Sequence, residues 1–228
     1  MARDVALICL ADGIVGVSFG ATSVVGGLPW WVPVAMSLLV FAGGAQIAAA
    51  GVVLAGGSPL AAVIAGGVLN TRLFPYGLAV ADIVGAGAGR GWRRWLRVLA
   101  GAQVITDESV AFALRPGDSA RRRPAFWGCG VALFAAWNVA VLAGVLLGSA
   151  VRDTGAFGLD ATFPAVMLAL ALPTLSTRPT RVAAGTGAVI AVVLTPVLPA
   201  GLPLLAALGG LGTRWGGWHR ERLAGGER

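Results

Sequence analysis

Charged residues are scarce in this sequence and are missing from long stretches of it. Only 12% of the 228 residues are charged, whereas soluble domains have about 25%. No charged residue occurs between Asp12 and Arg72, or between Arg123 and Arg152. Each gap exceeds the roughly 20 apolar residues that cross the hydrocarbon core of a bilayer. With 57% hydrophobic residues and a mean hydropathy of +0.83, the composition excludes a soluble domain and indicates a polytopic membrane protein.

Cysteine and histidine are also rare, and their scarcity excludes several kinds of site. Cys9 and Cys129 lie far apart in apolar segments without a Cys-x-x-Cys motif, so neither a disulfide framework nor a metal site is expected. The sequence GVSFG at residues 16–20 matches the Gly-x-Ser-x-Gly pattern of serine hydrolases. That chemistry needs a histidine base nearby, and the one histidine, His219, lies in the polar tail. We therefore expect no enzyme, no metal and no cofactor.

The positive charges are confined to short connections between apolar segments. The formal net charge is +7, and the arginines cluster at residues 90–97, 115–123, 178–181 and 214–228. Such loops are held at the cytoplasmic face of a membrane by the positive-inside rule. The arginines therefore indicate orientation rather than binding to nucleic acid, and they place the C-terminal tail in the cytoplasm.

The apolar segments predict an all-α, polytopic transmembrane helical bundle of about seven segments. They are unbroken rather than alternating with a period of two, which favours helices over a barrel. No polar linker is long enough to separate domains, so we expect a single integral membrane domain at 1–213 and a basic cytoplasmic tail at 214–228. The expected apolar segments are 5–25, 32–56, 59–87, 98–114, 125–150, 160–176, 182–197 and 199–213.

Two polar interruptions stand inside this apolar sequence. They are residues 70–76, with the sequence NTRLFPY, and residues 106–109, with the sequence TDES. A charged side chain at mid-bilayer costs about 2.5 to 3.5 kcal/mol, so it persists where it faces a bundle interior, a partner or a water-filled path. The interruptions are therefore the candidate functional site.

Broken or re-entrant helices are expected at two places. Segment 98–114 has arginine clusters on both sides. One crossing cannot connect two loops on the same face, so this segment should be broken or re-entrant. The prolines of residues 195–203 likewise predict a turn or a broken helix, because proline lacks a backbone donor.

Glycine pairs spaced four residues apart predict close packing of helices, because small residues let backbones approach in a membrane. The pairs are Gly16 and Gly20, Gly85 and Gly89, and Gly144 and Gly148.

Taken together, the interrupted segments resemble one known family. The stretches that carry the resemblance are FAGGAQ at 41–46, NTRLFPYG at 70–77, ITDESVAF at 105–112 and WNVAVLAG at 137–144, with Phe19-Gly20 in the first segment. In this order they look like the AzlC family, the large subunits of bacterial branched-chain amino acid exporters, including the YgaZ type. The resemblance runs from about residue 10 to 210.

This resemblance implies export of branched-chain or similarly apolar amino acids across the bacterial inner membrane. It implies a small AzlD-type membrane subunit as partner, and two copies of the chain could also assemble as a homo-oligomer. The sequence departs from the expected pattern at Leu73, where we expect the family to favour histidine, and at Pro75. Without that histidine, a group that titrates near neutral pH is missing.

The residue chemistry suggests how such a substrate would bind. Arg72 would bind the carboxylate of a zwitterionic amino acid, helped by the N-terminus of a half-helix beyond Pro75. Asp107 or Glu108 would bind the ammonium group or carry a coupled proton. Orienting hydrogen bonds are expected from four polar side chains: Gln46, Asn70, Thr106 and Tyr76.

Each assignment has a structural alternative. Arg72 could pair with Asp107 or Glu108 only to neutralise charge inside the bundle. Gln46 and Asn70 could join helices by hydrogen bonds, and Tyr76 could serve in packing. Asp12 and Asp82 are expected at the membrane interface. At the level of the whole protein, the alternatives are a passive channel or pore for small polar solutes and a structural or enzymatic membrane subunit.

Overall fold

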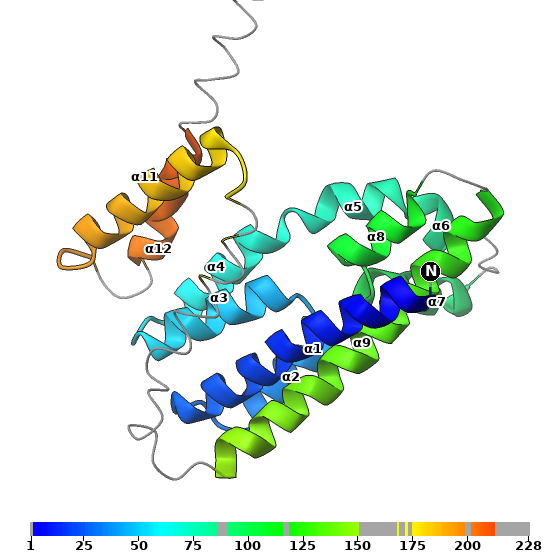
Figure 1. Ribbon diagram of the computed structural model, residues 1–228, viewed down its shortest axis with the longest axis horizontal. Coiled ribbons are helices and arrows are strands. Elements are labelled where there is room, and N and C mark those ends of the chain that lie inside the picture. The colour runs from blue at the N-terminus through cyan, green and yellow to red at the C-terminus, as the bar shows by residue number, and fades with distance from the viewer. Residues whose placement is uncertain are drawn as a thin grey trace, which may run out of the picture. The chain divides into compact units, whose positions relative to one another are not determined.

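The regular secondary structure of the described residues is helical throughout, as the sequence predicts (Figure 1). The computed structural model describes residues 2–85, 91–115, 119–150, 168, 172, 175–198 and 202–212. The helices are α1 (Ala2–Val25), α2 (Trp31–Leu39), α3 (Gly43–Leu54), α4 (Pro59–Asn70), α5 (Leu73–Ala79), α6 (Ala81–Gly85), α7 (Trp92–Gln103), α8 (Asp107–Ala113), α9 (Ser119–Ala150), α11 (Arg178–Leu194), α12 (Leu202–Ala206) and the 3₁₀ helix η4 (Ala207–Leu211).

Two of these helices are long and apolar enough to cross a membrane by themselves, at Ala2–Val25 and Ala120–Ala150. The remaining described helices are shorter, in part because three expected segments are interrupted. The count of about seven crossings stays a prediction. The expected segment 160–176 falls largely outside the described residues, and so do Gly89 and the tail at 214–228.

The chain divides into two compact units, each of which is described by itself. Unit 1 comprises Met1–Ile47 and Gly66–Asp160, and unit 2 comprises Ala48–Ala65 and Ala161–Arg228. The boundaries fall inside α3 and α4. All seven residues that the sequence nominates for the functional site belong to unit 1.

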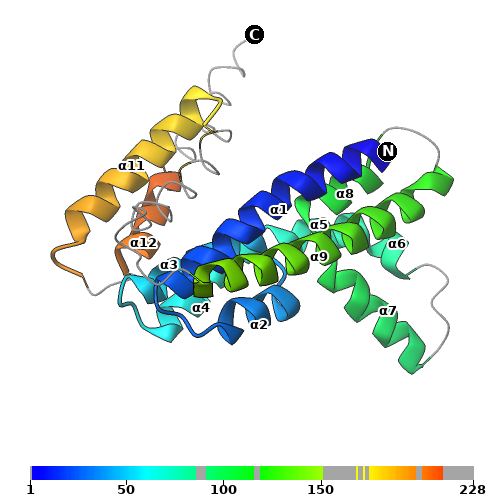
Figure 2. The same cartoon turned by 60° about the horizontal axis from the view of Figure 1, so that its bottom comes forward.

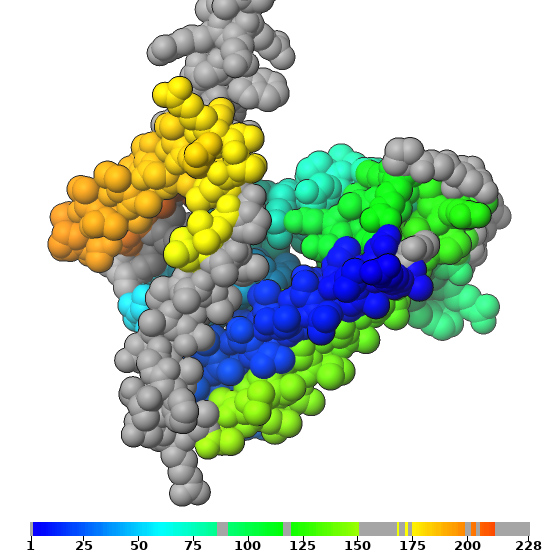
Figure 3. Space-filling model, viewed as in Figure 1, coloured from blue at the N-terminus to red at the C-terminus, as the bar shows by residue number. Residues whose placement is uncertain are grey.

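Helices α1 and α9 are the two longest described helices of unit 1 and lie side by side (Figures 2 and 3). A methyl group on Gly16 would lie 3.0 Å from Cβ of Ala140, and one on Gly148 would lie 3.0 Å from Cα of Ala21. Residue numbers therefore increase in the same direction along the two helices, so α1 and α9 run parallel. The predicted close packing through these glycine pairs is confirmed, whereas a methyl group on Gly85 would meet nothing within 4 Å.

An ion pair joins the N-terminal ends of these two helices. Arg115, shortly before α9, contacts Asp4 of α1 through Nη1 and Oδ2 at 3.0 Å. A second pair joins Arg122 of α9 to Asp82 of α6 at 3.1 Å. The arginine-rich end of α9 and the N-terminus of the chain therefore lie at the same end of unit 1.

Three expected segments are interrupted in unit 1. The breaks lie between α4 and α5 at Thr71–Arg72, between α7 and α8 at Val104–Thr106, and between α2 and α3 at Val40–Ala42. The break at Val104–Thr106 confirms the prediction for segment 98–114, and the break at Thr71–Arg72 lies close to the half-helix that was expected beyond Pro75. The third break was not predicted, because 32–56 was expected as one continuous segment; here Phe41 adopts a positive φ of 42° and ends the helical path.

Unit 2 contains a helical hairpin at its C-terminal end. Helix α11 begins at Arg178 after its N-cap residue, Thr177, and packs against η4. A methyl group on Gly210 would lie 2.6 Å from the amide nitrogen of Gly187, so the two backbones meet directly. A turn follows at residues 195–197, where the sequence predicted an interruption. Another apolar cluster joins the end of α3 to the start of α4, through Val52, Ala61, Ala62 and Ala65.

Candidate functional site

The break between α4 and α5 places Arg72 at the start of a half-helix. In an uninterrupted helix the backbone N–H of residue 75 would donate to the carbonyl of Thr71, but Pro75 has no such donor. The Thr71 carbonyl instead accepts from the amide of Phe74 at 3.2 Å. Helix α5 begins at Leu73 with Arg72 as its N-cap. The half-helix was expected to begin beyond Pro75; it begins before it, because proline is tolerated in a first turn, where amides lack intrahelical partners anyway.

The break between α7 and α8 is closed by a capping box. Thr106 has extended backbone angles, and its Oγ1 accepts from the amide of Ser109 at 3.1 Å. In return the amide of Thr106 donates to Ser109 Oγ at 2.9 Å. The hydroxyl of Thr106 is thus engaged in holding the helix terminus, and Asp107 and Glu108 stand in the first turn of α8, where the helix dipole favours negative charge.

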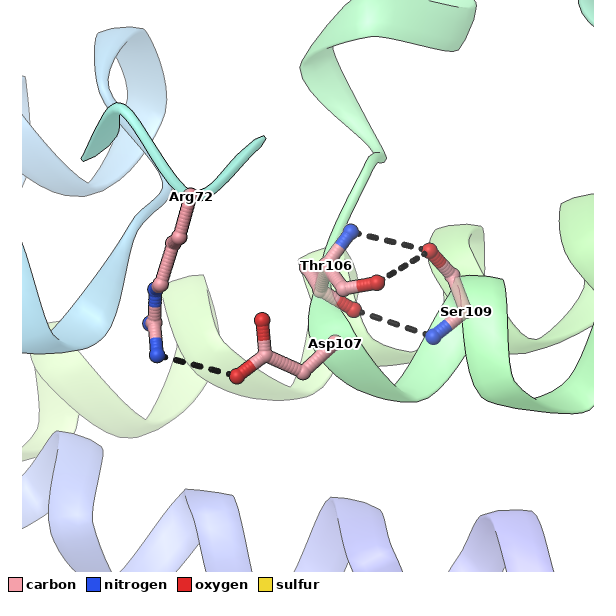
Figure 4. A network of polar contacts seen from close by, with 4 residues as sticks. All are labelled: Arg72, Thr106, Asp107 and Ser109. Atoms are coloured by element: carbon pink, nitrogen blue, oxygen red, sulfur yellow. Dashed lines mark hydrogen bonds and ion pairs between the residues drawn. The ribbon is translucent and has the colours of Figure 1, made fainter. Parts of the chain in front are cut away.

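An ion pair connects these two breaks. Arg72 Nη1 lies 3.0 Å from Asp107 Oδ2, and the side chains are 51% and 41% exposed (Figure 4). The pairing that the sequence left open as an alternative is therefore present. The other carboxylate oxygen, Asp107 Oδ1, is buried and has no hydrogen-bond partner among the described residues.

The third break lies beside the same guanidinium. A methyl group on Gly44, in the first turn of α3, would be 3.7 Å from Arg72 Nη2. The first amides of a helix have no intrahelical partners and form its positive end. Arg72 and the N-terminus of α3 therefore present positive potential at one place, and Asp107 supplies the nearest negative charge.

Two fully buried polar groups accompany this arrangement. Gln46 of α3 is 0% exposed, and neither its Oε1 nor its Nε2 has a partner in the described part of the chain. The indole Nε1 of Trp137 is likewise buried and unpartnered there. The Trp137 ring touches the start of α3, because a methyl group on Gly43 would be 3.3 Å from its Cζ2. Buried polar atoms without a protein partner mark positions for water or a ligand.

The remaining predicted residues differ in their surroundings. Asn70 is the last residue of α4 and is half-buried. Tyr76 packs against the apolar cluster that contains Val80 and Phe126, as in its structural alternative. Glu108 is half-buried in α8. Asp12 of α1 lies within electrostatic range of Glu108 and Asp107, so a third carboxylate lies near this region.

Sequence reasoning included Ser109 in the second interruption without giving it a role, and it did not place Trp137 in the site. The Thr-x-x-Ser spacing of a capping box was a usable signal for Ser109. In the sequence, Trp137 stands out only through the family resemblance, and nothing in its neighbourhood predicts contact with α3.

Interrupted apolar helices around a charged pair are an arrangement known from membrane transporters with discontinuous helices. The AzlC protein family model matches residues 7–151, and the chain belongs to the AzlC family. Its members are membrane proteins related to branched-chain amino acid transport. The match includes all three breaks and the ion pair. No curated protein and no solved structure matches the chain.

Proposed function

We propose that this chain is the large subunit of a secondary exporter for branched-chain or other apolar amino acids. It would work in the bacterial inner membrane with a small AzlD-like membrane subunit, coupled to an ion gradient. Membership of the AzlC family supports the substrate class. The parallel packing of α1 and α9 adds an orientation: by the positive-inside rule, the arginines at the start of α9 and the N-terminus of α1 both face the cytoplasm.

The observation that carries the proposal is the ion pair between Arg72 and Asp107. A zwitterionic amino acid has one carboxylate and one ammonium group. Its carboxylate can replace Asp107 opposite Arg72, and its ammonium group can replace Arg72 opposite Asp107. Its carboxylate would bind Arg72 and the free amides at the start of α3, because both attract anions. Its ammonium group would bind Asp107 or Glu108. Binding between Arg72 and Asp107 would then exchange one ion pair for two.

The buried polar groups support the same site. The amide of Gln46 can both donate and accept, and the indole of Trp137 can donate. Both lack protein partners among the described residues and adjoin the helix break at Phe41. The apolar side chain of the substrate would meet aromatic surface there, since Phe41 contacts Phe134 with ring centroids 4.9 Å apart.

Coupling to protons would use the excess of carboxylates. Asp12 lies within electrostatic range of Asp107 and Glu108, while Arg72 is paired with Asp107 alone among these three carboxylates. One of these carboxylates could take up and release the coupled proton as the substrate passes.

The test is efflux of leucine from cells or reconstituted vesicles loaded with a leucine dipeptide, with the partner subunit present. Arg72→Ala and Asp107→Asn should each reduce efflux at least tenfold. Asp82→Asn is the matched control, because it breaks an ion pair of similar length in the same unit. Unchanged efflux in both site variants would refute the proposed site. Efflux that does not respond to the proton gradient would favour a passive pore.

A charge exchange separates substrate binding from structural pairing. The double variant Arg72→Asp with Asp107→Arg keeps an ion pair but moves the negative charge to the side of the α3 N-terminus. A purely structural pair would regain both folding and efflux. We expect folding to recover and efflux to stay low, because the substrate carboxylate would lose its guanidinium.

A further inference from the structure

Helix α7 carries an apolar stripe that the described residues leave exposed. We define the α7 stripe as Trp92, Trp95, Leu96 and Leu99, which are 67%, 70%, 53% and 61% exposed. Their spacing of three, four and seven residues places them on one helical face. Two indoles and two leucines in one exposed row are more apolar surface than an aqueous environment favours.

The opposite side of α7 attaches the helix to unit 1. Val98 packs against the cluster that contains Val84 and Phe126. A methyl group on Gly101 would be 3.0 Å from Cγ2 of Val84, so α6 and α7 are in close contact. The α7 stripe is therefore turned away from unit 1, and Figure 2 shows α7 projecting from the rest of that unit.

The packing partners of α7 place it at the level of the membrane surface. Phe126 of α9 follows Arg122 by four residues, which is about 6 Å along a helix. The arginines at 121–123 mark the surface end of α9, because charged residues are disfavoured at bilayer depth. With 12 residues, α7 is about 18 Å long and cannot cross a hydrocarbon core of about 30 Å.

Two exposed arginines complete the surface. Arg93 and Arg94 follow Trp92 directly and lie off the α7 stripe. The guanidinium of Arg93 lies 5.9 Å from the centroid of the Trp92 ring. The sequence of α7 contains no acidic residue that could neutralise them within the helix. Guanidinium groups bind phosphates through two parallel hydrogen bonds, and tryptophan is enriched at membrane interfaces.

We propose that α7 lies in the plane of the membrane interface, with the α7 stripe among the acyl chains and with Arg93 and Arg94 bound to phosphates of anionic phospholipids. A phospholipid surface supplies both requirements at once, apolar chains and, directly above them, anionic groups. A protein partner would need an apolar groove with acidic residues on its rim. The proposal does not depend on the transported substrate.

Spin labels on α7 test its depth in the full chain, reconstituted in phosphatidylglycerol vesicles after replacement of Cys9 and Cys129 by alanine. A label at Leu96→Cys or Leu99→Cys should collide more often with oxygen than with a water-soluble nickel complex. A label at Arg94→Cys should show the reverse. Equal access of the nickel complex to Leu96 and Arg94 would overturn the proposal, as would shielding of Leu96 from both reagents, which indicates a protein partner.

A second experiment keeps the native cysteines and tests the phosphate contacts. Phosphatidylglycerol is titrated into the detergent-solubilised chain, and the melting temperature is followed. The rise should fall to less than half in the double variant Arg93→Gln, Arg94→Gln. It should persist in the control Arg178→Gln, Arg181→Gln, which removes the same charge from exposed positions of α11. An equal rise with phosphatidylcholine or inorganic phosphate, or equal loss in both variants, would refute specific binding of anionic lipid.

Discussion

Gly43 stands where α3 meets the face of Trp137, and its replacement by alanine should disturb that contact. The added methyl group would lie 2.9 Å from Cη2, 3.3 Å from Cζ2 and 3.4 Å from Cζ3 of the ring. The ring cannot easily retreat, because it stacks on Phe19 and is 6% exposed. Overpacking of this kind costs about 1 to 3 kcal/mol. Replacing a helical glycine by alanine returns about 0.5 to 1 kcal/mol, so Gly43→Ala should destabilise unit 1 by up to about 2.5 kcal/mol.

The neighbouring residue provides the matched control. At Gly44 the nearest atom to the added methyl group is Arg72 Nη2 at 3.7 Å, an ordinary contact. Gly44→Ala should therefore be neutral or stabilise by about 0.4 to 1 kcal/mol. Thermal unfolding of the two variants in the same detergent measures the difference. The smaller ring of Trp137→Phe should reduce the cost of Gly43→Ala in a double-mutant cycle. Equal stability of the two alanine variants would refute the packing of Trp137 on α3.

Three further substitutions address the helix breaks and the buried amide. Pro75→Ala restores an amide that can donate to the carbonyl of Thr71, so the melting temperature should hold or rise while leucine efflux falls, because the break at Arg72 is straightened. Gln46→Leu removes two buried unpartnered groups and should raise stability by about 1 to 3 kcal/mol, yet efflux should fall; lower stability would show that the amide has a structural partner. Thr106→Ala removes the N-cap of α8 and should lower the free energy of unfolding by about 0.5 to 2 kcal/mol. Thermal unfolding measures the loss, and Gly44→Ala, which leaves this cap intact, is the control.

The sequence revealed the breaks that involve polar residues and missed the one that does not. At Arg72 a charge, a threonine and a proline coincide, and at Thr106 a capping residue precedes two acids. Within an apolar segment, each pattern predicts a break in the helix. At Phe41 the helix ends through a positive φ at an aromatic residue, and such a residue does not change the hydropathy profile. The glycines at 43 and 44 suited close packing equally well, so they did not identify the break.

The boundaries of α7 show a different limitation. Its arginines were assigned to a loop because clusters of positive charge orient membrane proteins. The helix begins at Trp92, and its arginines alternate with the α7 stripe. A search for helical periodicity through the charged residues would have identified an amphipathic helix there. Charge counting and periodicity answer different questions, and only the second locates a helix that lies along a surface.

The buried polar groups of unit 1 indicate which kind of ligand the site can hold. The amide of Gln46, the indole N–H of Trp137 and Oδ1 of Asp107 have no partner among the described residues. Each such group costs about 1 to 3 kcal/mol when it stays unsatisfied. Together they approach the 5 to 15 kcal/mol by which a folded domain is stable at all. Water or a ligand bound at the site would satisfy these groups and remove that cost. Because the three groups include both donors and acceptors, a zwitterion with its hydrating water meets that requirement, whereas an apolar lipid chain does not.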